Sequence, residues 1–425
     1  MKEQIKSVRG MRDILPEEIK IWQKAEALIF KTLDSFGYEE IRLPVVEDLG
    51  LFQRGIGSYT DIVQKEMYIF QDKAGRYLTL RPEATASVVR AYIEHHLYLK
   101  KRITRLYYNG PMFRYDRPQK DRYRQFYQIG AEIFGGQDPY FDAEMIIILS
   151  KILDLVGIKE YRFEINSVGC NECKVKYGSS LKKFFESHKN HMCEDCQLRI
   201  KHNVLRILDC KVETCRDIIR KAPVIGNFLC ENCVNHQEAV YRILDMCQIN
   251  YEKNSYLVRG LDYYTQVVFE LKANNQDNAI AGGGRYNRLV EDLGGPITPA
   301  CGFAIGMDRL CSILLQSHAC EKMEVFVVFL DKQSIEKGML IINNSRIDGI
   351  AIAMDYTQRS LKNHLRLANR EHITHLLILG ENELIKECFL YKNMKDGSQR
   401  YIKFNELADF FKDLKNVKDL YMRTT

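Results

Sequence analysis

Hydrophobic and polar positions along the chain recur with two periods, and each period predicts one kind of element. In segment 14–38 the apolar residues recur at helical spacing, Pro16 suits the first turn, and Gly37 ends the run. The same period predicts helices at 83–99 and 140–156. A period of two, or a short apolar run, predicts strands at 39–48, 103–108, 112–115, 125–134, 161–167 and 256–272.

The middle of the chain breaks this pattern. Residues 168–250 are helical in character and basic, and they hold nine of the thirteen cysteines. We interpret them as an inserted helical module, after which the strand pattern resumes at 256. Three glycines at 282–284 then predict a turn, and residues 301–315 predict a strand that leads into a helix.

The last hundred residues have a rhythm of their own. We interpret residues 316–323 as a linker, and the segments after it alternate between strand and helix patterns. Strands are predicted at 324–330, 348–354 and 375–380, and helices at 333–344 and 359–371. Such alternation is typical of βαβ units and predicts a separate mixed α/β domain.

Length and composition narrow the class of protein. A chain of 425 residues is too long for one hydrophobic core, so two or three domains are expected. Apolar and charged residues make up 46% and 28% of it, as in ordinary globular proteins. No apolar run approaches the roughly 18 residues of a membrane helix. The N-terminus shows no secretory signal, so we expect a cytoplasmic protein whose odd number of cysteines provides free thiols or metal ligands.

Positive charge is concentrated more sharply than the totals suggest. The formal net charge of +6 permits nucleic-acid binding, but a lysine-rich solvated surface gives the same total. In "FRYDRPQKDRYRQ", residues 113–125, four arginines and a lysine lie between two predicted strands. Arginine forms paired contacts with phosphate, so this stretch predicts a loop that holds ATP or RNA phosphates. The alternative is a solvated hairpin tip.

Four other patterns are candidates for chemistry. Gln128 and Glu132 fall on one face of the next strand and predict a polar pocket, unless that face is exposed. Glu83 and Thr85 begin a helix, where they bind a ligand or simply cap it. In "VRGLDYYT" a charged cluster beside two tyrosines makes a poor core. In "AGGGRYN" the glycines permit close approach to a ligand, although the phosphate-loop lysine is missing.

The cysteines form recognisable pairs. Cys170 and Cys173 are separated by 19 residues from Cys193 and Cys196, and a paired C-x-x-C of this spacing predicts a zinc site. Cys210 and Cys215 follow, and then a third pair. The alternative is a helical module with reduced thiols and no metal.

Taken together and in this order, the motifs "LRPEATA", "FRYDRPQKDRYRQFYQIGAE", "RGLDYYT", "GGGRYN" and "GFAIGMDRL" resemble those of the class II aminoacyl-tRNA synthetases. The resemblance is specifically to the histidyl-tRNA synthetase family and covers essentially the whole chain. It implies an α+β protein with an antiparallel sheet core, flanking helices, a helical insertion and a C-terminal mixed α/β anticodon-binding domain. The implied boundaries are core 1–167, insertion 168–250, continued core 251–320 and anticodon-binding domain 324–425.

The resemblance also implies an activity and its partners. Such an enzyme activates L-histidine with ATP to histidyl-adenylate, releases pyrophosphate, and transfers histidine to the 3′ end of tRNA(His). The family is homodimeric, and Pro44 lies in its motif 1 at the dimer interface. Mg²⁺ is expected to accompany ATP. A structural Zn²⁺ at the insertion cysteines is compatible with the family but is not required by it.

The family's functional residues carry over to matching positions. Arg114, Arg259 and Arg309 are expected to be catalytic and to hold ATP, with Arg259 and Arg114 at the α-phosphate and Arg309 at the γ-phosphate. The residues expected to bind histidine are Glu83, Thr85, Gln128, Glu132, Tyr263, Tyr264 and Tyr286. The residues expected to contact the acceptor end of tRNA are Arg117, Gln119 and Arg122.

The chain departs from the family pattern at two positions, and two rival functions remain. Asn287 stands where the family usually has Asp, and Asp121 stands where Gly is common. One rival is the non-catalytic regulatory paralogue of ATP phosphoribosyltransferase, which typically lacks the anticodon domain and has degraded motifs. The other is a different class II synthetase, of the threonyl or prolyl type.

Overall fold

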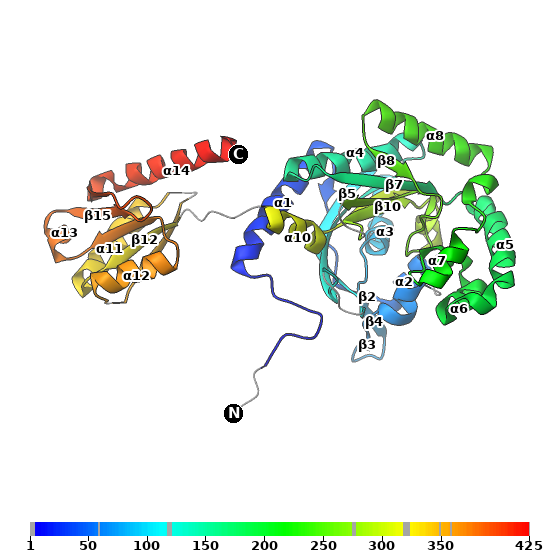
Figure 1. Cartoon of the computed structure of the whole chain (residues 1–425), viewed down its shortest axis with the longest axis horizontal. Coiled ribbons are helices and arrows are strands. Elements are labelled where there is room, and N and C mark those ends of the chain that lie inside the picture. The colour runs from blue at the N-terminus through cyan, green and yellow to red at the C-terminus, as the bar shows by residue number, and fades with distance from the viewer. Residues whose placement is uncertain are drawn as a thin grey trace. The chain divides into compact units, whose positions relative to one another are not determined.

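The structure is a computed structural model that describes residues 5–57, 60–116, 121–273, 278–317, 324–347, 350–357 and 359–424. These residues form two compact units, one on each side of residue 318 (Figure 1). Among the described helices, none is long and apolar enough to cross a membrane. The candidate site lies in the first unit.

The first unit is built on an eight-stranded sheet in the order β1-β5-β6-β11-β10-β9-β7-β8. The five inner pairings are antiparallel. Only the two outermost pairings, of the short strand β1 with β5 and of the short strand β8 with β7, are parallel. This confirms the predicted antiparallel core. The strands are β1 (Glu39–Glu40), β5 (Thr104–Phe113), β6 (Gln125–Phe134), β7 (Tyr161–Ser167), β8 (Tyr251–Lys253), β9 (Thr265–Ala273), β10 (Ala281–Arg285) and β11 (Ala300–Gly306).

The two faces of this sheet differ in chemistry because side chains alternate along each strand. From β6, Ile129, Ala131 and Ile133 enter a large apolar core beneath four helices. These helices are α1 (Pro16–Ser35), α4 (Pro139–Val156), α8 (Glu231–Met246) and α10 (Met307–Ser317). The opposite face, which carries Glu132, packs against α3 (Thr85–Glu94) and several buried tyrosines. The candidate site is on that second face.

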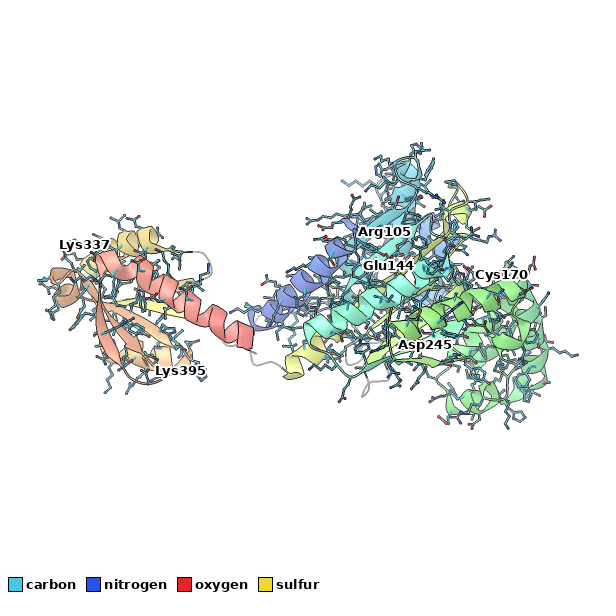
Figure 2. The ribbon with its side chains drawn as sticks, turned by 90° about the horizontal axis from the view of Figure 1, so that it is seen from above. Arg105, Glu144, Cys170, Asp245, Lys337 and Lys395 are labelled. Carbon is cyan, nitrogen blue, oxygen red and sulfur yellow. The ribbon has the colours of Figure 1, made fainter. Side chains whose placement is uncertain are left out.

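Polar contacts also join the sheet to its helical layer. Arg105 of β5 lies beside Glu144 of α4 (Figure 2), with 3.2 Å between Nε and Oε1. A smaller sheet of β2 (Val46–Asp48), β4 (Tyr77–Leu80) and β3 (Ile69–Gln71) packs with α2 (Leu49–Ile56). The extended segment 39–48 is therefore shared between two sheets, with Pro44 between them.

Five predicted elements are corrected. The glycines at 282–284 lie inside strand β10 and do not form a turn. Segments 103–108 and 112–115 belong to one continuous strand, β5, and strand 256–272 begins only at Thr265. Helix 83–99 is shorter, because Glu83 caps it and a 3₁₀ turn replaces its last residues.

The insertion is helical, as predicted, and has its own small core. Its first three helices are α5 (Asn171–Ser187), α6 (Glu194–His202) and α7 (Glu213–Ile219), and α8 returns the chain to the sheet. Tyr177, Leu181 and Phe185 of α5 pack against Ile200 of α6. Cysteines 196, 210 and 215 are buried in the same core.

The second unit is a mixed sheet in the order β13-β12-β14-β15-β16, with parallel pairs followed by antiparallel ones. The predicted α/β alternation is found as β12 (Glu324–Phe329), α11 (Lys332–Ser345), β13 (Ala351–Asp355), α12 (Leu361–Arg370) and β14 (His375–Leu379). The elements that the pattern did not predict are α13 (Glu381–Ile385), β15 (Cys388–Asn393), β16 (Gln399–Lys403) and α14 (Leu407–Thr424).

Candidate active site

A buried carboxylate defines the centre of the site. Glu132 of β6 is 1% exposed, and its two oxygens accept hydrogen bonds from the Thr85 and Tyr286 hydroxyls. Burial raises its pKa from the ordinary value of 4.5 to about 8, although both hydrogen bonds act in the opposite direction. That Glu132 lines a polar pocket stays a prediction, but its hydrogen-bond partners are polar, as expected, and no ion pair to a cation is found for it within the described part of the chain.

Room for Glu132 comes from the neighbouring strand. Gly302 of β11 is its register partner, and a Cβ there would lie 1.7 Å from Oε2 of Glu132. Only glycine leaves the space that this carboxylate occupies. The sequence analysis did not single out Gly302, because the contact depends on the pairing of two strands far apart in the chain.

The rings of three tyrosines pack together beside Glu132. Tyr263 packs edge-on against Tyr286, with ring centroids 5.5 Å apart, and lies 4.7 Å from the Tyr264 ring. All three rings are at most 8% exposed. Tyr108 of β5, which the sequence analysis missed, is buried in the same cluster. Burial has the largest effect and raises its pKa, and the negative charges of Glu132 and Glu83 raise it further.

Gln128, on the same strand as Glu132, has a side-chain oxygen that accepts no hydrogen bond from the described residues. It lies four residues before Glu132, so both side chains project from one face of β6. Its Oε1 is buried and has no donor among the described residues. Buried acceptors are normally satisfied, so this amide oxygen suits an N–H donor of a bound ligand.

Glu83 has a structural role in addition to its predicted one. Its carboxylate accepts from the backbone N–H groups of Thr85 at 2.7 Å and Ala86 at 2.9 Å, and so caps α3. Burial raises its pKa, and the two backbone bonds oppose that shift. The cap fixes Thr85 where its hydroxyl reaches Glu132.

The predicted phosphate-binding arginines come from three elements. Arg114 follows β5, and its Nε donates to the Pro82 carbonyl at 2.8 Å. Arg309, in the first turn of α10, donates to the Ala279 carbonyl at 2.6 Å. Burial lowers the pKa of Arg309, and the charges of Arg122 and Arg114 lower it further. Positive charges held this close together favour a polyanionic ligand.

Arg259 lies across strand β10 and is anchored by a carboxylate. Its Nη1 donates to Glu270 of β9, a residue that the sequence analysis did not assign. Burial has the largest effect on the Arg259 pKa and lowers it, but Glu270 and the neighbouring Tyr264 and Tyr263 together outweigh burial, and the pKa is raised overall. A Cβ at Gly282 would lie 2.5 Å from the guanidinium nitrogens. The glycine run therefore provides close approach, as predicted, but to this arginine and from within a strand.

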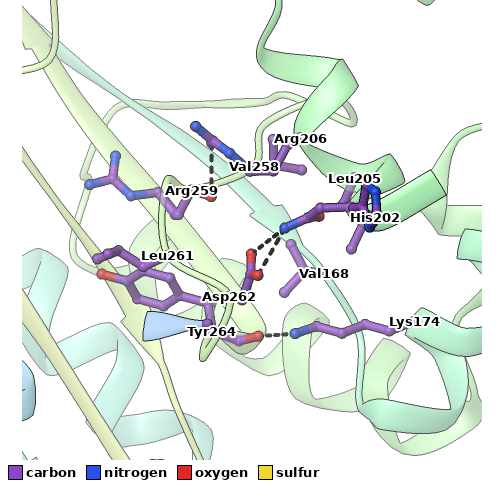
Figure 3. Close-up of a pocket in the computed structure, with 12 residues that line it drawn as sticks. Val168, Lys174, His202, Leu205, Arg206, Val258, Arg259, Leu261, Asp262 and Tyr264 are labelled. Carbon is purple, nitrogen blue, oxygen red and sulfur yellow. Dashed lines mark hydrogen bonds between the residues drawn. The ribbon is translucent and has the colours of Figure 1, made fainter. Parts of the chain in front are cut away.

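The insertion holds the loop that carries Arg259. Figure 3 shows Arg259, Asp262 and Tyr264 around a cavity of about 290 Å³. Arg206 of the insertion donates to the Arg259 carbonyl at 3.2 Å, and Lys174 donates to the Tyr264 carbonyl. Burial lowers the pKa of Lys174 to about 8, and Asp262 opposes that shift. Insertion side chains thus position a loop of the candidate active site.

The two departures from the family pattern are accommodated locally. Asp121 has a backbone φ of 58°, the left-handed conformation that glycine adopts most readily and that Asp tolerates. Asn287 accepts from Arg285 at 3.2 Å and donates to Gln266 at 2.9 Å, so its side chain is fully engaged. Arg285 itself is buried in an ion pair with Asp142. It is a structural residue of this motif.

The structure thus brings several of the predicted histidine and ATP residues close together, since Glu132 bonds with Thr85 and Tyr286, and Glu83 lies near Arg114, whose charge in turn acts on Arg309. Of the predicted acceptor-stem contacts, Arg122 forms an ion pair with Asp116, whereas Arg117 and Gln119 lie outside the described residues. The cysteines form two groups of four that could each hold a metal ion. The predicted pairing of Cys170 and Cys173 with Cys193 and Cys196 is wrong, because helix packing places these two pairs in different groups.

An antiparallel sheet that carries clustered arginines beside a buried polar pocket defines a class II aminoacyl-tRNA synthetase. The family model described as histidyl-tRNA synthetase matches residues 10–176 and 197–310. A model described as an anticodon binding domain matches residues 324–414. The chain belongs to the histidyl-tRNA synthetase family.

Individual relatives agree with this assignment. The histidine--tRNA ligase of Thermodesulfovibrio yellowstonii is 45% identical over 409 residues, which cover 95% of this chain and 97% of the relative. That of Aquifex aeolicus is 44% identical, covering 95% of this chain and all of the relative. The crystal structure of apo S. aureus histidyl-tRNA synthetase is 36% identical and matches with a TM-score of 0.78, covering 96% of this chain and all of that one.

Proposed function

We propose that this protein activates histidine with ATP and then transfers it to tRNA(His). The observation that carries the proposal is the buried carboxyl group of Glu132 with its Thr85 and Tyr286 partners, together with the nearby group of arginines. A carboxylate and tyrosine hydroxyls can pair with both imidazole nitrogens, and a side chain without those nitrogens would leave buried polar groups unpaired.

Histidine would be held at two places. Glu132, Tyr264 and Tyr286 would read the imidazole, with Tyr263 completing the wall. Glu83, Thr85 and Gln128 would hold the α-amino group. The unpaired Oε1 of Gln128 supports this assignment, and so does the Glu83 carboxylate, whose oxygens each keep a lone pair beyond the helix cap.

The first step is an in-line displacement at phosphorus. The histidine carboxylate attacks the α-phosphorus of ATP, a new O–P bond forms, and the bond to the β-phosphate oxygen breaks to release pyrophosphate. Arg259 and Arg114 would stabilise the charge that develops on the α-phosphate oxygens, and Arg309 would hold the γ-phosphate. Catalysis then rests on positioning and on preorganised positive charge.

Mg²⁺ is expected to enter the site bound to ATP. The described residues offer no group of three or more carboxylates that could hold an ion, so the nucleotide would supply most of the ligands. The ion would neutralise part of the triphosphate charge. Zn²⁺ at the cysteines is a separate part of this proposal and does not touch the reaction.

The second step requires tRNA. The 3′-terminal ribose hydroxyl attacks the histidyl carbonyl and releases AMP. The acceptor end would be met by Arg117, Gln119 and Arg122, and the insertion (168–250) would clamp the acceptor arm. Residues 324–425 would bind the anticodon. The core would comprise 1–167 and 251–320. The anticodon-binding model over the second unit supports this division.

A homodimer in the cytoplasm completes the proposal. Four large apolar side chains are between 40% and 58% exposed on the small sheet β2-β4-β3 that follows Pro44: Val46, Ile69, Phe70 and Tyr77. Strand alternation places Val46 and Phe70 on one face of this sheet and Ile69 and Tyr77 on the other, and a second copy packed against the sheet would cover part of this exposed apolar area. Ribosomes use the charged tRNA in the cytoplasm, where the thiols also stay reduced.

The first measurement is ATP–pyrophosphate exchange against all twenty amino acids, followed by charging of tRNA(His). Exchange with histidine alone, and then charging, is the expected result. No exchange with any amino acid, from protein verified as folded, would contradict the proposal and favour the regulatory paralogue. Exchange with another amino acid would indicate a different synthetase.

A further inference from the structure

We propose that each chain binds two Zn²⁺ ions in the insertion, at two nested tetrathiolate sites. The outer site consists of Cys170, Cys173, Cys230 and Cys233, and the inner site of Cys193, Cys196, Cys210 and Cys215. The proposed aminoacylation reaction uses neither ion. The inference therefore stands or falls independently of that reaction.

The spacing of the sulfurs fits one tetrahedral ion in each group. A Zn–S bond is about 2.3 Å, so the four sulfurs around one ion form a tetrahedron with edges of about 3.8 Å. In the outer group the Sγ atoms of Cys170 and Cys173 are 3.5 Å apart, and those of Cys170 and Cys230 are 4.0 Å apart. In the inner group Cys193 and Cys210 are 3.8 Å apart.

Competing uses of the thiols fit these distances poorly. A disulfide needs about 2.05 Å between sulfurs, and all the cysteines in both groups are free. In each group the sulfurs all lie within 4.8 Å of one another. That space holds a single ion, whereas an iron–sulfur cluster places several ions and sulfides between its thiolates.

The backbone around both groups is arranged to stabilise thiolates. Cys170, Cys193 and Cys230 are the N-cap residues of α5, α6 and α8, where the helix dipole favours negative charge. In the outer group the Cys170 N–H lies 3.2 Å from the Cys233 Sγ, and the Cys230 N–H lies 3.1 Å from the Cys173 Sγ.

The inner group repeats one of these contacts, from the Cys193 N–H to the Cys215 Sγ at 3.3 Å. Backbone N–H bonds to ligand sulfurs are typical outer-shell partners of metal thiolates.

The nesting gives the two ions different structural roles. The outer ion would fasten the point where the chain enters the insertion to the point where α8 begins its return. The inner ion would close the small core around α6 and α7. A module with so small a core gains much of its stability from such cross-links.

The outer site also adjoins the candidate active site. Lys174 follows Cys173 directly and donates to the Tyr264 carbonyl, and Gly169 and Val168 form backbone hydrogen bonds with Gln266 at 2.9 and 2.7 Å. The outer ion would therefore hold the base of the insertion against the start of β9, next to Tyr264.

Elemental analysis of the full-length protein, purified under reducing conditions from zinc-supplemented cells, tests the proposal. We expect two zinc ions per chain, one in Cys233→Ser and one in Cys215→Ser. Cys247→Ser is the matched control, because Cys247 is exposed and belongs to neither group, and it should keep two ions. One zinc ion or fewer in the wild type, iron in place of zinc, or equal loss from the control would overturn the proposal.

A second measurement avoids reliance on variants that fail to fold. The wild-type protein is stripped with a chelator and titrated with Co²⁺ while the absorption of thiolate-bound cobalt is followed. Saturation at two equivalents with a tetrahedral spectrum is expected. Saturation at one equivalent, or no thiolate band, would overturn the two-site assignment.

Discussion

Glu132 is the residue on which the choice of histidine is expected to depend. In Glu132→Gln an amide replaces the carboxyl group that would pair with the imidazole, and we expect the KM for histidine to rise by about 10- to 100-fold, the effect of leaving one buried polar group poorly paired. The KM for ATP should stay within about twofold. Pyrophosphate exchange measures both constants. Glu144→Gln is the control, because Glu144 contacts Arg105 away from Glu132. An unchanged histidine KM in Glu132→Gln would contradict the assignment of Glu132 to histidine recognition.

The same carboxyl group makes stability depend on pH. Its pKa is about 8 in the folded protein and near 4.5 when exposed, so the folded state binds the extra proton between these values. Stability is therefore highest below pH 4.5 and falls as pH rises through 8, by on the order of 4 kcal/mol for this group. Glu132→Gln should lack this component.

Urea unfolding followed by fluorescence measures the effect, because the single tryptophan, Trp22, is buried in the first unit. The free energy of unfolding of the wild type minus that of Glu132→Gln should fall between pH 5 and pH 8.5. A constant difference would show that Glu132 does not titrate in this range.

Arg259 is expected to act on the transition state rather than on histidine binding. In Arg259→Ala the kcat for exchange should fall at least about 100-fold, the effect of removing one such contact. Calorimetry should give a histidine Kd within about threefold of the wild type. Arg288→Ala is the control, because Arg288 lies three residues from the run of glycines but is 53% exposed. Loss of histidine binding in Arg259→Ala would indicate a structural role instead.

At the scale of elements, strand β10 shows how a sheet positions an active-site side chain. Its glycines leave one face free of side chains, and Arg259 occupies that space beside Glu270. Sequence alone favoured a turn here, because three consecutive glycines weaken a strand. Pairing with β9 and β11 on both sides outweighed that preference.

Gly282→Ala tests this role of the strand. The added Cβ would meet the Arg259 guanidinium at 2.5 Å and displace it, so we expect exchange to fall by about 10- to 100-fold. The KM for histidine should change far less. Gly226→Ala is a matched control, since a Cβ there meets nothing within 4 Å. Full activity in Gly282→Ala would show that Arg259 acts from another position.

At the scale of the whole molecule, the exposed apolar side chains of the small sheet predict a dimer. Sedimentation velocity should give a species of twice the 49.7 kDa chain mass. Phe70→Glu places a charge among these side chains and should shift the equilibrium towards the monomer. Tyr401→Glu, at a similarly exposed ring in the second unit, should not. A monomeric wild type would contradict the proposal.

The sequence by itself determined most of the elements and the broad class, while its choice of site residues stays a prediction. Local pattern was sufficient for α1, α4 and β6, because apolar spacing, Pro16 and Gly157 act within a few residues. Motifs also identified Glu132 and the three arginines. The fold class was confirmed, and so was membership of the family.

Only the tertiary structure decided which distant residues meet. Gly302 and Glu270 join the candidate site through strand pairing, because Gly302 lies opposite Glu132 of a distant strand, and Glu270 lies opposite Gly282, where it meets Arg259. The cysteines paired as nested groups instead of neighbours along the chain, because helix packing brings Cys230 back to Cys170. Short-range pattern records the period of each element, whereas partners across a sheet or between helices are set by how the elements pack.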